Sequence, residues 1–340
     1  MRDRRIRGLD GLRALCALFI LWSHVAQNDF CKWEIEFIPV PECCAYVFFA
    51  ISGLLAGYRI DETNSNRSYY KKKAQRLLPL YYSYIVVSIL VYSILGQTDQ
   101  VFENGLFYYL FLIPQVPFCT KTALLPFVHL WFVGVIVLFY FLFPFFARFK
   151  VNKRKTEALC LAIAWLLIKL VLRVFFGSGS ILYKLVSVTS FDVLFIGVWV
   201  GLLIKEDNRM LEKLKNYYSL GLFAGLLFLC SGLYGSLIPA PVRMDFIAIL
   251  ALVFIVFQQK ELPFPNLENR FLNWLGSISY EIYVTQILVI ILLSEAYSKA
   301  GIVFPSLVIY MICTAIVIGV AWCFHEAINL LNLSRFKANG

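Results

Sequence analysis

Residues 9–26 read LDGLRALCALFILWSHVA, and residues 159–176 read LCLAIAWLLIKLVLRVFF. Both stretches are mostly apolar and long enough for a helix to cross a hydrocarbon core of about 30 Å. Barrel strands would instead show short segments of alternating hydrophobicity, and that period-2 pattern is absent from the sequence. These stretches therefore predict membrane-spanning helices.

The composition of the whole chain agrees with this interpretation. Of the 340 residues, 60% are hydrophobic and only 15% are charged, and the mean hydropathy is +0.74. A soluble domain is nearer half apolar and a quarter charged, and the 17% aromatic content excludes a disordered chain. The sequence predicts an all-α, polytopic membrane protein.

Ten apolar stretches predict a bundle of about ten transmembrane helices. No loop is long enough for a second domain, so residues 1–340 are expected to form a single transmembrane domain. The longest loop, 96–126, holds an apolar segment at 105–113, which predicts an interfacial or re-entrant segment over the bundle. We expect no cleaved signal peptide, because the first span lacks a small-residue cleavage site. The predicted spans are 9–26, 40–58, 77–95, 127–147, 157–176, 185–204, 217–238, 244–259, 276–294 and 302–325.

The net charge of +10 taken alone suggests a nucleic-acid partner, but the positions of the basic residues along the chain favour another explanation. With a cytoplasmic N-terminus, 23 of the 31 Lys and Arg residues fall inside, five fall outside and three lie within spans. Because cytoplasmic loops of membrane proteins are rich in Lys and Arg, this distribution predicts that both termini are cytoplasmic. Most of the charge therefore sets topology, some is available to anionic lipid or an anionic substrate, and we expect no nucleic-acid partner.

Two ionisable side chains share one face of the first span. Arg13 and His24 are eleven residues apart, which places them about 20° from the same direction at 100° per residue, with a rise of about 16 Å. Ionisable groups within spans are costly and often functional. The alternative is that Arg13 extends to the inner interface while His24 is hydrogen-bonded in the outer one.

Other motifs flank the next three spans. Gly53 and Gly57 are four residues apart, a spacing that favours close helix packing over chemistry. A basic inner loop, KKKAQR at 71–76, runs into Pro79, which is expected near a helix start. Its Lys73 and Arg76 project from one side and could hold phosphates, although the loop is also a topology determinant.

The remaining histidines and buried charges have simpler explanations. His129, in the motif HLWF at 129–132, is either an aromatic-belt anchor or a site residue, and His325 is expected at the inner interface. Pairing or extension to the interface explains most of the other ionisable residues in spans. No Cys or His spacing resembles a metal site, so no metal is expected. The ionisable residues within spans that pairing or extension to the interface explains are drawn from Lys169, Arg173, Asp192, Asp245 and Glu281.

Taken in order, these motifs resemble the acyltransferase-3 family of integral membrane acyltransferases, which includes bacterial polysaccharide O-acetyltransferases. The resemblance covers about residues 6–330. Each motif alone is weak evidence for the family, whereas five motifs in the same order and spacing are strong evidence. The motifs are LDGLR at 9–13 with His24, FFAISG at 48–53, K-x-x-RLLP at 73–79, HLWF at 129–132 and LGSISYEIY at 275–283.

The resemblance implies a ten-helix bundle that passes an acyl group, usually acetyl, from cytoplasmic acyl-CoA to a hydroxyl of a sugar or lipid-linked glycan at the outer face. Arg13 and His24 match the family's essential pair, which makes them the expected catalytic residues. Arg13, Lys73 and Arg76 are the expected acyl-CoA contacts, with Lys73 replacing the usual Arg. We expect His129, Trp131 and Tyr280 to contact the acceptor. The expected location is the bacterial cytoplasmic (inner) membrane.

Two departures from the family pattern limit this transfer of roles. Gln286 stands where many members have a His, and Val135 with Ile136 occupies a stretch where some carry a Glu pair. The family's hydrolase-like outer domain is also not expected here.

The neutral imidazole of His24 is suited to take a proton from a hydroxyl near working pH. A covalent acyl-His intermediate stays open as an alternative. The alternatives to an enzyme are a proton-coupled transporter or flippase and a non-catalytic scaffold.

Overall fold

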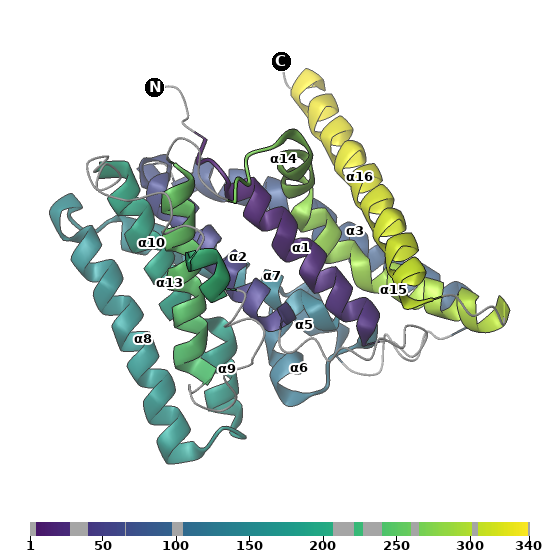
Figure 1. The fold of residues 1–340 in the computed structure, drawn as a ribbon, viewed down its shortest axis with the longest axis horizontal. Helices are drawn as coiled ribbons and strands as arrows, with labels where there is room; N and C mark the ends of the chain where they lie inside the picture. The colour runs from purple at the N-terminus through teal and green to yellow at the C-terminus, as the bar shows by residue number, and fades with distance from the viewer. Residues whose placement is uncertain are drawn as a thin grey trace.

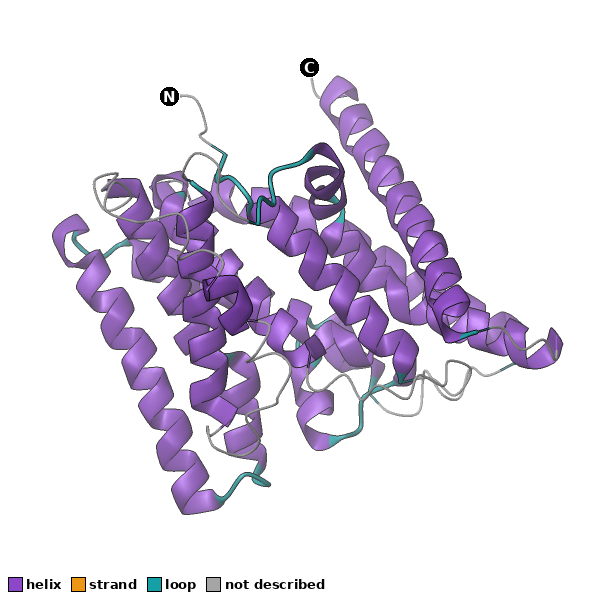
Figure 2. Ribbon diagram, in the orientation of Figure 1, coloured by secondary structure: helices purple, strands orange, loops and turns teal. Residues whose placement is uncertain are grey.

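A computed structural model describes residues 5–27, 40–64, 66–96, 105–206, 221–226, 240–259, 265–300 and 305–338. Within these ranges every regular element is a helix and none is a strand (Figure 2), which confirms the all-α prediction. The elements are α1 (Leu9–Ala26), α2 (Val40–Tyr58), η1 (Ile60–Asn64), α3 (Asn66–Ile94), α5 (Leu106–Leu110), α6 (Gln115–Thr120), η2 (Leu125–Leu130), α7 (Trp131–Ala147), η3 (Val151–Lys153), α8 (Arg154–Phe176), α9 (Ile181–Thr189), α10 (Phe191–Glu206), α13 (Ala240–Gln258), α14 (Arg270–Ser277), α15 (Ser279–Ala300) and α16 (Ser306–Ala338).

The chain is a multi-pass membrane protein. Seven helices of the described residues are long and apolar enough to cross a membrane, and α2 contains a shorter apolar helix, Cys43–Tyr58. Described helices coincide with nine of the ten predicted spans, while 217–238 lies largely outside the described residues. The total of ten therefore stays a prediction. The start of α1 and the end of α16 lie at the same end of the bundle (Figure 1), and their cytoplasmic location also stays a prediction.

The third span begins earlier than the sequence analysis expected. Helix α3 starts at Asn66, so the basic stretch 71–76 is helical and Pro79 lies inside the helix. The expectation of a loop was wrong because Lys, Arg, Gln and Ala are good helix formers, and hydropathy records only the part of a helix that is apolar. The helix thus carries its basic turns directly into the apolar span.

Two other predicted segments are interrupted. The span at 185–204 is divided between α9 and α10, because Ser190 has a left-handed backbone with φ 49°. The segment at 105–113 forms the five-residue helix α5, and Pro114 then precedes α6. This region packs on the bundle as expected, since the Tyr81 hydroxyl donates to the backbone carbonyl of Tyr109 at 2.9 Å.

The centre of the bundle is held by close contact between α2 and α10. A Cβ atom on Gly53 would lie 2.9 Å from the carbonyl carbon of Leu194, and one on Gly197 would lie 2.8 Å from the backbone nitrogen of Leu54. Real Cβ contacts are essentially never shorter than 3.0 Å. The packing interpretation of the Gly53 and Gly57 spacing is therefore confirmed.

Helices α8 and α16 occupy opposite flanks of this centre (Figure 1). Only 11% of the apolar window of α8 and 22% of that of α16 is buried. Their exposed side chains are large and apolar, such as Val174 and Met311. We expect these two faces to contact lipid, which is as apolar as they are.

Candidate active site

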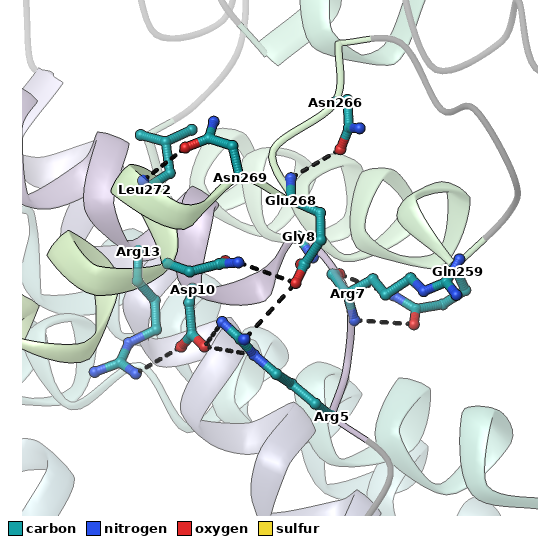
Figure 3. A network of polar contacts seen from close by, with 11 residues as sticks. Arg5, Arg7, Gly8, Asp10, Arg13, Gln259, Asn266, Glu268, Asn269 and Leu272 are labelled. Atoms are coloured by element: carbon teal, nitrogen blue, oxygen red, sulfur yellow. Dashed lines mark hydrogen bonds and ion pairs between the residues drawn. The ribbon is translucent and has the colours of Figure 1, made fainter.

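The start of α1 is fixed by the segment that leads into α14 (Figure 3). The backbone N–H of Gly8 donates to the Glu268 carboxylate at 2.7 Å, and that of Arg7 donates to the Gln259 side-chain oxygen at 3.1 Å. Gly276 lies so close to Asp10 that a Cβ there would stand 2.8 Å from the Cα of Asp10. These contacts fix where the first turn of α1 stands against α14.

Arg13 leaves this anchored turn toward the interior. Its guanidinium bonds the Asp10 carboxylate at 3.3 Å, Asp10 also binds Arg5 at 2.8 Å, and the Arg13 side chain is only 11% exposed (Figure 3). The Asp10 carboxylate is therefore shared between two guanidinium groups, and the charge of Glu281 also acts on Arg13.

A small pocket of about 70 Å³ opens beside Arg13, and we call it the Arg13 pocket. Arg76 and Tyr280 also line it, and the Tyr280 hydroxyl donates to the backbone carbonyl of Leu77 at 2.9 Å. Two of the three expected acyl-CoA contacts therefore lie in one pocket. Its lining is Arg13, Phe48, Ile51, Ser52, Leu55, Arg76, Leu77, Phe132, Val133, Ile136, Tyr140, Ser279, Tyr280 and Tyr283.

Tyr140 stands among the cations of this pocket and was missed by the sequence analysis. The Lys73 ammonium lies 4.1 Å from the centre of the Tyr140 ring, within cation–π range. The positive charges of Lys73, Arg76 and Arg13 all act on Tyr140, and its hydroxyl is hydrogen-bonded to Ser52. Three cations from two helices thus converge on one phenol. Tyr140 is hidden in the aromatic run FYFLFPFF at 139–146, where no signal separates it from its neighbours.

His24 lies near the opposite end of α1 and lines a larger cavity, of about 620 Å³, which we call the His24 cavity. The imidazole of His24 is hydrogen-bonded to the side chain of Gln286. Gln286 is completely buried, and its Nε2 also donates to the backbone carbonyl of Tyr283 at 3.1 Å. The position that departs from the family pattern is therefore a direct partner of the candidate base.

His129 reaches the same cavity from the turn before α7. Its Nε2 lies 2.8 Å from the backbone carbonyl of Val284. Because a carbonyl can only accept, Nε2 carries the proton and Nδ1 is left as an acceptor in the neutral ring. His129 is only 3% exposed, which does not fit an aromatic-belt anchor facing lipid.

Among the residues that the structure describes, one side chain lines both spaces. Tyr283 lines both the Arg13 pocket and the His24 cavity, and its hydroxyl donates to the backbone carbonyl of His129 at 2.5 Å. Its ring lies against Phe132, with ring centres 5.1 Å apart. The cationic pocket and the histidine cavity are therefore back to back across Tyr283. The lining of the His24 cavity is Ile20, His24, Gln27, Ala45, Tyr46, Phe118, Leu125, Val128, His129, Trp131, Val188, Tyr283, Ile287, Ile290 and Ile291.

The structure divides the seven sequence-predicted site residues between these spaces. Arg13, Arg76 and Tyr280 line the pocket, and Lys73 adjoins it through Tyr140. The other three, His24, His129 and Trp131, line the cavity. Tyr280 was grouped with His129 and Trp131 as an acceptor contact, and the structure does not bring it to their cavity.

Several other buried charges adjoin the two spaces without lining them: the Lys169 ammonium lies 5.9 Å from the centre of the Tyr46 ring, and the Glu281 charge acts on Arg13. Lys169 forms an ion pair with Asp192, both side chains are 1% exposed, and Asp192 is also hydrogen-bonded to Asp245. The pairing expected for these residues is therefore confirmed for Lys169 and Asp192. His325 bonds Glu281 through Nδ1 at 2.8 Å. None of these residues lines the Arg13 pocket or the His24 cavity.

Cys119, on α6, lies close to the cavity but is a poor nucleophile. Burial raises the pKa of its thiol to about 11, although the nearby charge of Lys184 acts in the opposite direction. The thiolate is the nucleophilic form of cysteine, so at neutral pH almost all of this side chain is unreactive thiol. A covalent acyl-cysteine relay at Cys119 is therefore disfavoured.

Comparison with known proteins agrees with this geometry. A family model described as an acyltransferase domain matches residues 6–326. The chain belongs to the acyltransferase-3 family. It is also 28% identical to a Bacillus subtilis (strain 168) protein named "Putative peptidoglycan O-acetyltransferase YrhL". That alignment covers 95% of this chain and 54% of the relative, so the chain spans about half the relative's length. No solved structure matches the chain.

The match to the acyltransferase-3 family covers every residue of both spaces. Arg13 and His24 stand in the first matched helix, and Tyr283 stands in α15, still inside the matched range. The family assignment and the pocket geometry therefore concern the same part of the chain. Gln286, the departure noted in the sequence, also falls within it.

Proposed function

We propose that this protein is a membrane O-acyltransferase that takes an acetyl group from acyl-CoA at the Arg13 pocket. It delivers the group to a hydroxyl of a sugar or lipid-linked glycan in the His24 cavity. The observation that supports this is the back-to-back arrangement of the two spaces, which meet at Tyr283. The family match and the name of the Bacillus subtilis relative point to the same chemistry.

The cationic pocket suits the donor. Coenzyme A carries phosphates, and guanidinium and ammonium groups bind phosphate by charge-assisted hydrogen bonds. At about 70 Å³ the pocket admits only a narrow group, so the pantetheine arm enters while the nucleotide stays at the mouth. Arg76 is exposed there, and Lys73 stands beside it on α3.

The distance between the two ends of α1 is comparable to the length of a pantetheine arm. Eleven residues of helix separate Arg13 from His24, a rise of about 16 Å. An extended pantetheine arm bridges a distance of this order, which brings a thioester from the phosphate contacts toward Tyr283. The acyl carbon then lies next to the cavity that holds the acceptor.

His24 acts as the base. Its neutral imidazole takes the proton of the acceptor hydroxyl as the new C–O bond forms and the thioester C–S bond breaks. Gln286 holds the ring through its hydrogen bond. The proton ends on the coenzyme A thiol, so the products are the O-acetyl ester and free coenzyme A, and no net charge is created.

The sidedness of this reaction follows from the charge distribution. The 23 basic residues assigned to the inside place Arg13, Lys73 and Arg76 at the cytoplasmic face, where acyl-CoA is found. His24 and His129 then lie toward the outer face. We infer that donor and acceptor enter from opposite sides of the cytoplasmic membrane.

The test uses purified full-length protein and radiolabelled acetyl-CoA. We expect label transfer to glycan, or slow release as acetate, and His24→Ala should lower turnover by about 10²–10⁴-fold, the usual contribution of a general base. Lys150→Ala is the control, because Lys150 is exposed and lines neither space, and it should keep wild-type turnover. Retention of more than about a tenth of the activity in His24→Ala would remove His24 as the base.

A second arm of this experiment separates the enzyme from a transporter. In sealed vesicles of known orientation, acetyl-CoA supplied only at the face bearing Arg13 should support transfer. Transfer from donor supplied only at the other face would refute the cross-membrane reaction. Movement of glycan across the vesicle without acetylation would favour a flippase.

A further inference from the structure

A second cavity, of about 590 Å³, lies next to the His24 cavity, and we call it the Lys184 cavity. Tyr46, Phe118, Val128 and Val188 line both, so the two are contiguous. Each lies within the range of small-molecule sites, about 300–1,000 Å³. The lining of the Lys184 cavity is Tyr46, Phe118, Cys119, Lys121, Ala123, Val128, Tyr183, Lys184, Ser187 and Val188.

The two cavities differ in charge. The His24 cavity is lined by apolar and neutral polar side chains together with its two histidines. The Lys184 cavity adds two ammonium groups, from Lys121 and Lys184, and none of its described lining residues is a carboxylate. Neither lysine has an ion-pair partner among the residues that the structure describes. The positive charge of this cavity is therefore available to a ligand.

The fold brings both lysines to one place. Lys121 caps the end of α6, whereas Lys184 lies in the middle of α9. The charge of Lys184 acts on the Cys119 thiol, only two residues before Lys121. The two cations thus border the same short stretch of α6.

The walls between the lysines and His24 suit a sugar. Phe118 stacks on Trp131 with ring centres 5.0 Å apart, and the Tyr46 hydroxyl donates to the backbone carbonyl of Ser187 at 3.2 Å. Rigid aromatic walls of this kind pack well against the apolar faces of sugar rings. A ligand bound between them extends from the lysines toward His24.

We propose that Lys121 and Lys184 bind an anionic group of the acceptor, so that the acceptor is a carboxylate-bearing or phosphate-bearing sugar. This inference rests on the proposed function, because it identifies the His24 cavity as the place of the accepting hydroxyl. The lysines hold the anion in the Lys184 cavity while a neighbouring sugar unit occupies the His24 cavity. Charge-assisted hydrogen bonds to the anion then set both specificity and register.

The test measures binding to the purified full-length protein in lipid nanodiscs, without acyl-CoA. Three probes differ in charge: a hyaluronan tetrasaccharide carries carboxylates, N-acetylglucosamine 1-phosphate carries a phosphate, and chitotetraose is neutral. We expect at least one anionic probe to bind at least about fivefold more tightly than chitotetraose, as one hydrogen bond to a charged group provides. The tighter anionic probe identifies the carboxylate or the phosphate as the preferred group.

Lys184→Gln and Lys121→Gln should each raise the Kd of the preferred anionic probe at least about fivefold and leave chitotetraose binding unchanged. The matched control is Lys150→Gln, an exposed lysine between α7 and α8 that lines none of these cavities. Equal binding of charged and neutral probes, or wild-type Kd values in both variants, would overturn the proposal. Binding requires no turnover, so a failure of acyl transfer is detected separately from a failure of this site.

Discussion

Substituting Gly53 by alanine tests the closest helix contact in the bundle. A Cβ there would lie 2.9 Å from the carbonyl carbon of Leu194 and nearer still to its oxygen, whereas ordinary contact begins at 3.4 Å. Helices α2 and α10 must therefore separate by at least about 0.5 Å, the difference between these distances. The obstructing atoms are backbone, so no side chain can rotate away.

The expected cost follows from this geometry. Overpacking a close-packed interior typically costs about 1–3 kcal/mol. A cost of this size lowers the unfolding midpoint by a few degrees, because each kcal/mol corresponds to roughly 2–4 °C for chains of 150–250 residues and less for longer ones. Activity should fall as well, since the neighbouring Ser52 and Leu55 form one wall of the Arg13 pocket.

Gly319→Ala is the matched control for this prediction. Gly319 also lies inside a long helix, α16, but a Cβ there would meet nothing within 4 Å. Both substitutions gain about 0.5–1 kcal/mol of helix propensity, so their difference isolates the steric effect. Thermal unfolding of the purified protein measures it. A midpoint for Gly53→Ala equal to or above that of Gly319→Ala would refute the close α2–α10 contact.

Two further predictions concern lysines. Lys73→Gln should raise the Kd for acetyl-CoA at least about fivefold, as loss of one charged contact does, when the Kd is measured by calorimetry at low salt. Lys299 is exposed and paired with Glu295, so Lys299→Gln should leave this Kd unchanged. Equal Kd values in the two variants would exclude Lys73 as a donor contact. Lys169→Met should destabilise the fold by about 3–5 kcal/mol, because it leaves the Asp192 carboxylate buried without its cation. The triple variant with Asp192→Leu and Asp245→Leu, which also removes the carboxyl group bonded to Asp192, should recover most of this loss in thermal unfolding, and no recovery would show that the buried charges are not the cause.

Much of the candidate site could be predicted from the sequence. The motifs around Arg13 and His24 are local, and the eleven-residue spacing on one helix sets their separation whatever surrounds them. Lys73 and Arg76 were placed beside Arg13 from the family pattern, and the structure brings all three cations to Tyr140. By contrast, the role of Gln286 as a partner of His24 had no local signal, since the two residues are far apart in the chain.

The sequence by itself determined that the chain is a helical membrane protein, because hydropathy and length are properties of one segment at a time. It also determined which segments carry the ionisable groups. Only the tertiary structure decided which of these groups meet. Helix α7 is apolar on every side, so no amphipathic stripe indicates which of its faces points inward. The rotation that aims Tyr140 at the cations is therefore set by packing against neighbouring helices, which no single segment records.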